Sequence, residues 1–185
     1  MRNAFHDDLD RVSDQLVAMT GMVGTAMKRA TEALVNADLG IAESVIAADD
    51  DIDQVRRQVD DLSVDLLARQ QPVATDLRMV VTAMHMASDI ERMGDLARHI
   101  AKVARMSAPN VTVPENLRPI IAEMARVGDK LVQATGDAIG SKDVYAAVEI
   151  GRIDDEMDEL HKKVFTTLLD NWQHGMEAGV NATLL

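Results

Sequence analysis

The sequence Asp49-Asp50-Asp51-Ile52-Asp53 returns 105 residues later as Asp154-Asp155-Glu156-Met157-Asp158. The same offset aligns further pairs of identical residues: Met19 with Met124, Asp38 with Asp143, Ala42 with Ala147, Val59 with Val164 and Asp65 with Asp170. These matches indicate a duplicated unit, in which an acidic element lies within a shared apolar frame.

Apolar residues around the first acidic element recur at steps of three and four, which predicts amphipathic helices. The first run covers residues 5–34, and the second covers 41–66 after a break at 36–40. Gln70-Gln71-Pro72 ends the second helix, because a proline disfavours helical geometry in the residue before it. A third helix is predicted from about residue 74 to about residue 106. Short connections make successive helices antiparallel neighbours.

The second half repeats this plan after a segment, 107–116, that holds two prolines and no helical period. Helices are predicted at about 117–139 and 142–174, and the repeat places the start of a sixth helix near Val180. We therefore expect an all-α fold of tandem antiparallel three-helix bundles. Residues 1–106 form the first bundle, 107–116 the linker, and 117–185 a second bundle that lacks its final helix.

The missing helix predicts an uncovered apolar face on the fifth helix, consisting of Ile150, Ile153, Met157, Leu160, Val164 and Leu168. An exposed apolar face of this size favours contact with another protein surface. We expect a truncated chain or proteolytic product that forms a dimer or higher oligomer. The alternative is that the last two helices pack on the first bundle without association.

Composition excludes several classes of function. The formal net charge of -12 argues against nucleic acid, whose phosphates require clustered Lys and Arg. The chain has no Cys, which excludes thiolate catalysis and is compatible with the reducing cytoplasm where we place the protein. It shows no secretory signal at its start and no uncharged apolar stretch of membrane-spanning length. It also shows no Gly-rich phosphate loop or nucleophile with an oriented base, so we expect no catalysis.

The third helix carries apolar residues on two sides. One side, which we predict to be core, runs through Met79, Ala83, Met86, Ile90, Met93, Ala97 and Ile100. The other side runs through Leu77, Val81, Met84, Ser88, Glu91 and Asp95. Its three Met residues at positions 79, 86 and 93 are an alternative partner surface, but we favour burial.

Carboxylates one helical turn apart predict a cation site. Asp49 and Asp53 lie on one flank of the second helix, Asp154 and Asp158 on the same flank of the fifth, and Glu91 and Asp95 on the third. Together they would offer the oxygen ligands that Mg²⁺, Ca²⁺, Mn²⁺, iron or zinc accept. Two alternatives stay open. In the first, the six carboxylates are simply part of the solvated surface of their helices. In the second, Arg78 and Arg92 form ion pairs with the neighbouring carboxylates in place of a metal.

The same residues carry a family resemblance. Gln70-Gln71-Pro72-Val73-Ala74-Thr75-Asp76-Leu77-Arg78, followed by Asp89-Ile90-Glu91-Arg92-Met93-Gly94-Asp95, resembles the QQPVAxDLR turn and LERIGD helix of the PhoU family of phosphate-signalling proteins. The acidic repeats match the family's D-x-x-V/I-D element in each half. The resemblance covers essentially the whole chain.

The resemblance implies two similar three-helix bundles and a repressor of phosphate uptake and phosphate-starvation signalling. Such a protein acts between the ATPase subunit of a phosphate ABC transporter and a sensor histidine kinase, and reaches the membrane only through these partners. Some members bind iron or zinc clusters through E/D-x-x-x-D motifs, which would carry over to Asp49, Asp53, Glu91 and Asp95, and to Asp154 and Asp158. The family's second ERIGD-like helix is absent from this chain, so the second-half site is incomplete within one copy.

A second function class is a carboxylate-rich helical metal-binding protein of the di-iron or metal-storage type. Ferritin-type di-iron sites use Glu-x-x-His elements on facing helices. This chain offers only Asp158-x-x-His161, which argues against that class.

Overall fold

The protein, represented by a computed structural model, is described at residues 2–111 and 113–170, and every regular element of this part is an α-helix. The helices are α1 (Arg2–Asn36), α2 (Leu39–Gln70), α3 (Thr75–Ser107), α4 (Arg118–Ser141) and α5 (Val144–Asp170). Their number and order confirm the predicted pattern. The first break is shorter than predicted, since it spans only residues 37 and 38. The predicted end of the fifth helix at residue 174 and the predicted start of a sixth lie outside the described residues.

Local side-chain and backbone chemistry sets the helix ends. The Asp38 carboxylate accepts a hydrogen bond from the Ile41 backbone N–H at 2.9 Å, which caps the start of α2. Gln71 ends α2 in the left-handed conformation, with φ 47° and ψ 53°, and its N–H donates to the Leu67 carbonyl. A proline lies in the first turn of α4, where its missing N–H costs nothing.

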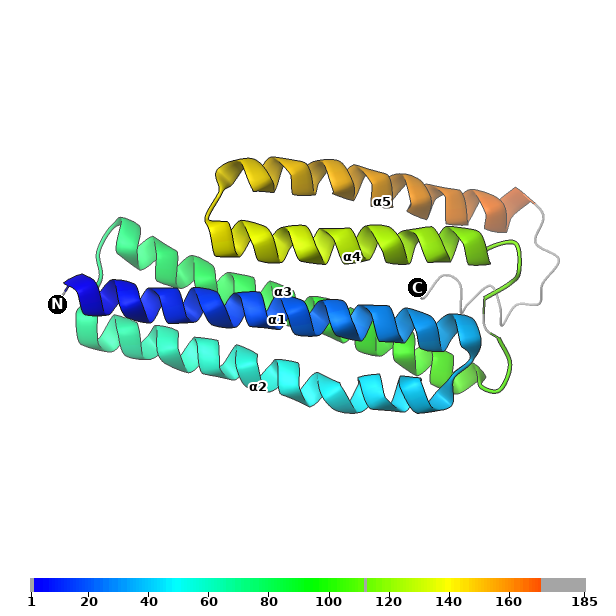
Figure 1. Cartoon of the computed structure of the whole chain (residues 1–185), viewed down its shortest axis with the longest axis horizontal. Helices are drawn as coiled ribbons and strands as arrows, with labels where there is room; N and C mark the ends of the chain where they lie inside the picture. Colours follow the sequence, from blue (N-terminus) through cyan, green and yellow to red (C-terminus); the bar gives the residue numbers. More distant parts are fainter. Residues whose placement is uncertain (1, 112, 171–185) are drawn as a thin grey trace.

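The first three helices form an antiparallel bundle in which each helix packs on the other two (Figure 1). Its interior is apolar along the full length of α1, where Val12, Leu16, Met19, Val23 and Leu34 are all at most 2% exposed. The heptad of α2 faces the same interior, with Val45, Ile52, Val59 and Leu66 buried. The periodic apolar runs therefore form the core as predicted.

The orientation of α3 differs from the prediction. Its buried row is Val80, Ala83, Ala87, Ile90, Gly94, Ala97 and Ala101, which is made mostly of small residues. Met79 and Met86 are 39% and 38% exposed, and Met93 is partly buried, so the predicted burial of the Met row is wrong for its first two members. Small side chains let α3 lie close to its neighbours: a β-carbon built on Gly94 would stand 3.0 Å from Cδ1 of Ile52.

The second half adds a helical hairpin to one side of this bundle. α4 packs along α1, and α5 packs on α4, so α5 lies on the far side of α4 from α1 (Figure 1). One apolar cluster joins both halves, because Ile120, Ile121 and Val164 pack with Leu34 and Ala101 of the first bundle. No helix in the described part is long and apolar enough to cross a membrane.

The repeat allows burial to be compared position by position. In the first half, Ala42, Val45 and Ile52 are at most 3% exposed. Their counterparts 105 residues later are less buried: Ala147 is exposed, whereas Ile150 and Met157 are only partly buried. Of the predicted uncovered face on α5, Val164 alone is fully buried, at 4% exposure, and the other members are partly buried. Among residues 2–111 and 113–170, this face of α5 is therefore less covered than the corresponding face of α2.

Candidate functional site

Four carboxylates from α2 and α3 gather on one side of the first bundle. We call Asp49, Asp53, Glu91 and Asp95 the acidic quartet. One guanidinium, that of Arg98, bonds to both Asp49 and Asp95, and the charges of Asp95 and Asp53 both act on Glu91. The antiparallel pairing of α2 with α3 therefore brings together the two i, i+4 pairs that the sequence singled out.

Asp49 is the most buried member, with 5% of its surface exposed. It follows Val45 by one turn and lies at the edge of the apolar stripe of α2, which places its carboxyl group against the bundle. Burial raises the pKa of Asp49, the Arg98 guanidinium lowers it, and the neighbouring Asp95 and Asp53 raise it further. A buried carboxylate in this position requires a nearby positive charge to stay ionised.

Arg98 supplies that charge from α3. Its Nη1 donates to Oδ2 of Asp49 at 2.5 Å, and its Nη2 donates to Oδ1 of Asp95 three residues earlier on the same helix. The Arg98 side chain is 35% exposed, against 6% for that of Asp49. The guanidinium thus lies at the rim of the quartet and bridges two helices.

The other two carboxylates have looser positive neighbours. Asp53 lies 4.0 Å from Nη1 of Arg57, and both side chains of that pair are substantially exposed. Burial raises the pKa of Glu91, and the charges of Asp95 and Asp53 raise it further, while Arg56 lowers it. Arg56 itself pairs with Asp60 at 3.2 Å. Arginines therefore surround the quartet on both helices.

The salt-bridge alternative named Arg78 and Arg92 as the partners of these carboxylates. The structure gives this role to Arg98, whereas Arg78 and Arg92 are both exposed on α3. The sequence contained a signal for the correct residue, because Asp95-x-x-Arg98 has the i, i+3 spacing of a helical ion pair. Its contact with Asp49 depends on the packing of α2 against α3.

The predicted second-half residues are placed differently. Asp154 and Asp158 are both exposed on α5, one turn apart. Their role as metal ligands stays a prediction.

A metal ion suits the donor chemistry of the quartet but not its present arrangement. Carboxylate oxygens are the ligands that hard cations prefer. Within the described residues, however, no three Asp, Glu or His side chains converge closely enough to hold a metal ion. Asp49 and Asp95 converge on a guanidinium instead. The six predicted ligands remain untested, and the first four would have to rearrange before they could bind a metal together.

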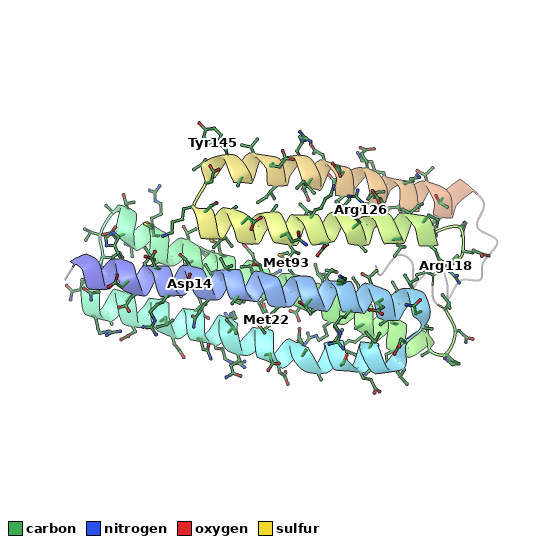
Figure 2. All side chains as sticks on the ribbon, viewed as in Figure 1. Asp14, Met22, Met93, Arg118, Arg126 and Tyr145 are labelled. Atoms are coloured by element: carbon green, nitrogen blue, oxygen red, sulfur yellow. The ribbon has the colours of Figure 1, made fainter. Side chains whose placement is uncertain are left out.

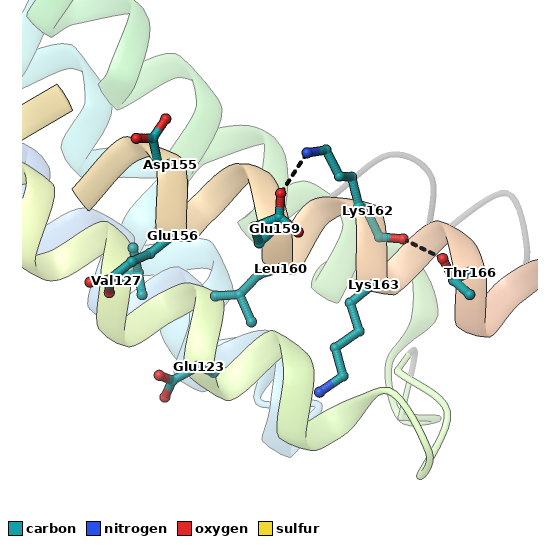
Figure 3. A pocket seen from close by; sticks show the side chains of 9 residues that line it. All are labelled: Glu123, Val127, Asp155, Glu156, Glu159, Leu160, Lys162, Lys163 and Thr166. Atoms are coloured by element: carbon teal, nitrogen blue, oxygen red, sulfur yellow. Dashed lines mark hydrogen bonds and ion pairs between the residues drawn. The ribbon is translucent and has the colours of Figure 1, made fainter. Parts of the chain in front are cut away.

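A hollow of about 790 Å³ lies elsewhere, between α4 and α5 (Figure 3). Charged side chains dominate its lining, among them Glu123, Glu156, Glu159 and Lys163. Lys162 bonds to Glu159 at 2.6 Å on the same helix. The predicted ligands Asp154 and Asp158 do not line this hollow.

Comparison with known proteins gives a consistent result. The family model described as PhoU domain matches residues 16–104. The chain is 44% identical over 186 residues to the phosphate-specific transport system accessory protein PhoU homolog 2 of Mycobacterium tuberculosis, which covers 100% of this chain and 87% of that protein. It is 34% identical over 168 residues to the PhoU homolog of Pseudomonas aeruginosa, with 89% of this chain and 68% of that protein covered.

Solved structures agree with the sequence matches. The crystal structure of PhoU from Pseudomonas aeruginosa matches with a TM-score of 0.86 and 29% identity, over 97% of this chain and 87% of that one. The phosphate transport system regulatory protein PhoU from Streptococcus pneumoniae matches with a TM-score of 0.82 and 24% identity, over 97% and 85% of the two chains. The second match shows a shared fold alone.

Proposed function

The chain belongs to the PhoU family, and we propose that it represses phosphate uptake and phosphate-starvation signalling as an adaptor between a phosphate transporter and a sensor kinase. A regulatory role in phosphate transport follows from the family. The observation that carries it is the 44% identity, over the whole of this chain, with a protein named as an accessory protein of the phosphate-specific transport system. The coupling of transporter to kinase is the proposed part.

The proposed partners are the ATPase subunit of a phosphate ABC transporter and a sensor histidine kinase. The adaptor acts in the cytoplasm, reaches the membrane only through these partners, and works by binding rather than by catalysis. An exposed apolar surface at the start of α3 and in the connection before it supports a binding role. Val73, Leu77 and Val81 follow one another at four-residue steps and are 75%, 41% and 39% exposed. Neighbouring exposed apolar groups favour contact with another protein.

A cell-based experiment tests the proposal. In a strain lacking this protein, expression of phosphate-starvation genes at high phosphate should rise, and the full chain should restore repression. A Leu77→Glu/Val81→Glu variant should fold but fail to restore it and lose capture of the ATPase subunit. Val64→Glu, at a position 55% exposed on α2, serves as the matched control and should restore repression. Unchanged expression in the deletion strain would refute the proposed role.

Association of two copies is part of the proposal. A groove of about 400 Å³ separates α3 from the α4–α5 connection and is lined by apolar residues that include Met86, Met93, Ile139 and Ile150. Val144, Tyr145 and Val148 extend this apolar surface, since they are 79%, 85% and 73% exposed at the start of α5. Tyr145 projects outward from the hairpin (Figure 2). We assign this surface to contact with a second copy, because Val144, Tyr145 and Val148 expose three large apolar side chains beside this groove.

Metal binding by the six predicted carboxylates is a second candidate function, of the di-iron or metal-storage kind. The assembly of the acidic quartet from two helices favours it, whereas the bridging arginine weighs against it. Metal content of protein purified without chelator separates the two candidates. A stoichiometric content of iron, zinc or manganese that is lost when the four first-half carboxylates are changed to Ala would support this second function.

A further inference from the structure

The acidic quartet already contains a cation of its own. We propose that Arg98 is a built-in counter-cation that excludes divalent metal ions from Asp49 and Asp95. The quartet is then an ion-pair network that joins α2 to α3, and its positive centre is a side chain rather than a bound ion.

The first step concerns the charge that must be balanced. Asp49 is 5% exposed, and three further carboxylates of the quartet surround it. Ionised carboxylates this close repel one another, and a buried one is stable only when a positive group lies against it. Either a metal ion or a side chain can supply that group.

The second step concerns geometry. Arg98 uses separate nitrogens for its two partners, Nη1 for Oδ2 of Asp49 and Nη2 for Oδ1 of Asp95. These are oxygens that a metal ion between α2 and α3 would also need. A guanidinium and a divalent ion repel each other, so a metal ion could bind these oxygens well only after Arg98 had moved away from them.

The third step concerns the choice of arginine. A guanidinium is protonated throughout the physiological pH range and has a planar fork of donors that suits two carboxylates at once. A change in pH would therefore not remove this competitor. Arg98 is also 35% exposed, so a shorter neutral side chain at this position leaves no cavity inside the core.

The experiment compares Mn²⁺ binding by the full wild-type chain with that of the single variants Arg98→Gln and Asp49→Asn and of the double variant Arg98→Gln/Asp49→Asn. Titration calorimetry and the shift of Tm with added MnCl₂ provide two readouts. Wild type should bind Mn²⁺ weakly and no better than the single variant Asp49→Asn. Arg98→Gln should bind it about tenfold tighter or more, which corresponds to about 1.4 kcal/mol, and the double variant should lose this gain.

Two outcomes would overturn the proposal. One is tight Mn²⁺ binding by wild type that Asp49→Asn abolishes, and the other is equal affinity in wild type and Arg98→Gln. If Arg98→Gln does not fold, Arg98→Lys provides the comparison, because an ammonium is a single point charge that bridges two carboxylates less well. Arg98→Lys should then bind Mn²⁺ with an affinity above that of wild type, and an unchanged affinity would refute the proposal. These readouts do not depend on which transport partner the protein has.

Discussion

Gly136 of α4 and Thr20 of α1 approach so closely that a β-carbon on residue 136 would stand 2.7 Å from the Thr20 hydroxyl oxygen. That hydroxyl is held in place, because it donates to the Val17 carbonyl at 2.7 Å and Thr20 is 3% exposed. The two residues lie where the second half of the chain packs on the first. The missing side chain at position 136 thus allows α4 to pack this closely on α1.

Gly136→Ala should therefore destabilise the protein by about 1 to 3 kcal/mol, the usual cost of overpacking, although Ala is the better helix former. Urea unfolding followed by circular dichroism measures the change. Gly21→Ala is the matched control, since a β-carbon there meets nothing within 4 Å. The control should be neutral or stabilising. Equal stability of Gly136→Ala and wild type would contradict the steric argument.

Gln71→Gly should stabilise the protein by roughly 0.5 to 1 kcal/mol. Gln71 ends α2 with φ 47°, a left-handed conformation that costs energy for any residue with a β-carbon and that glycine adopts freely. The same substitution at Gln70, the last residue of α2, serves as a control and should not stabilise. The midpoint of thermal unfolding reports both changes, and a lower midpoint for Gln71→Gly would show that its side chain has another role.

The pair formed by Lys142 Nζ and Asp10 Oδ1, 2.7 Å apart, links the start of α1 to the end of α4. Its hydrogen bond and charge hold the pKa of Asp10 below the ordinary value of 3.8. A lowered folded pKa gives stability that is present above pH 3.8 and is lost as the pH falls through the folded pKa.

Asp10→Asn should consequently lower Tm slightly at pH 7 and less so at high salt, because the pair is exposed. Once the pH is below the folded pKa of Asp10, the variant and wild type should unfold at the same temperature. A difference in Tm that persists or grows in acid would show that Asp10 acts through something other than its charge.

Val148→Glu should weaken association of the chain. Light scattering at micromolar concentration should give a dimer or larger species for wild type and for Val64→Glu, and a smaller species for Val148→Glu. Val148 is 73% exposed, so the substitution should not disturb folding. A wild-type chain that scatters as a monomer of about 20.2 kDa would remove the proposed contact between copies.

The amino-acid sequence by itself determined the helices and much of their pairing. The apolar residues at steps of three and four from Phe5 onward predicted α1. This spacing places them on one face of a helix, and burial of that face against other helices stabilises it. Gln71 and Pro72 fixed the end of α2. The i, i+4 spacing of the carboxylates, combined with antiparallel neighbours, was sufficient to predict that the quartet would gather.

The tertiary structure decided what periodicity leaves open. The third helix is apolar around more than one side, so several orientations satisfy its pattern; close approach to Ile52 selected the row of small residues around Gly94 and left Met79 and Met86 at the surface. The pairing of Arg98 with Asp49 was likewise invisible in the sequence, since 49 residues separate them. The packing of α2 against α3 brings the Arg98 guanidinium within hydrogen-bonding distance of the buried Asp49 carboxylate.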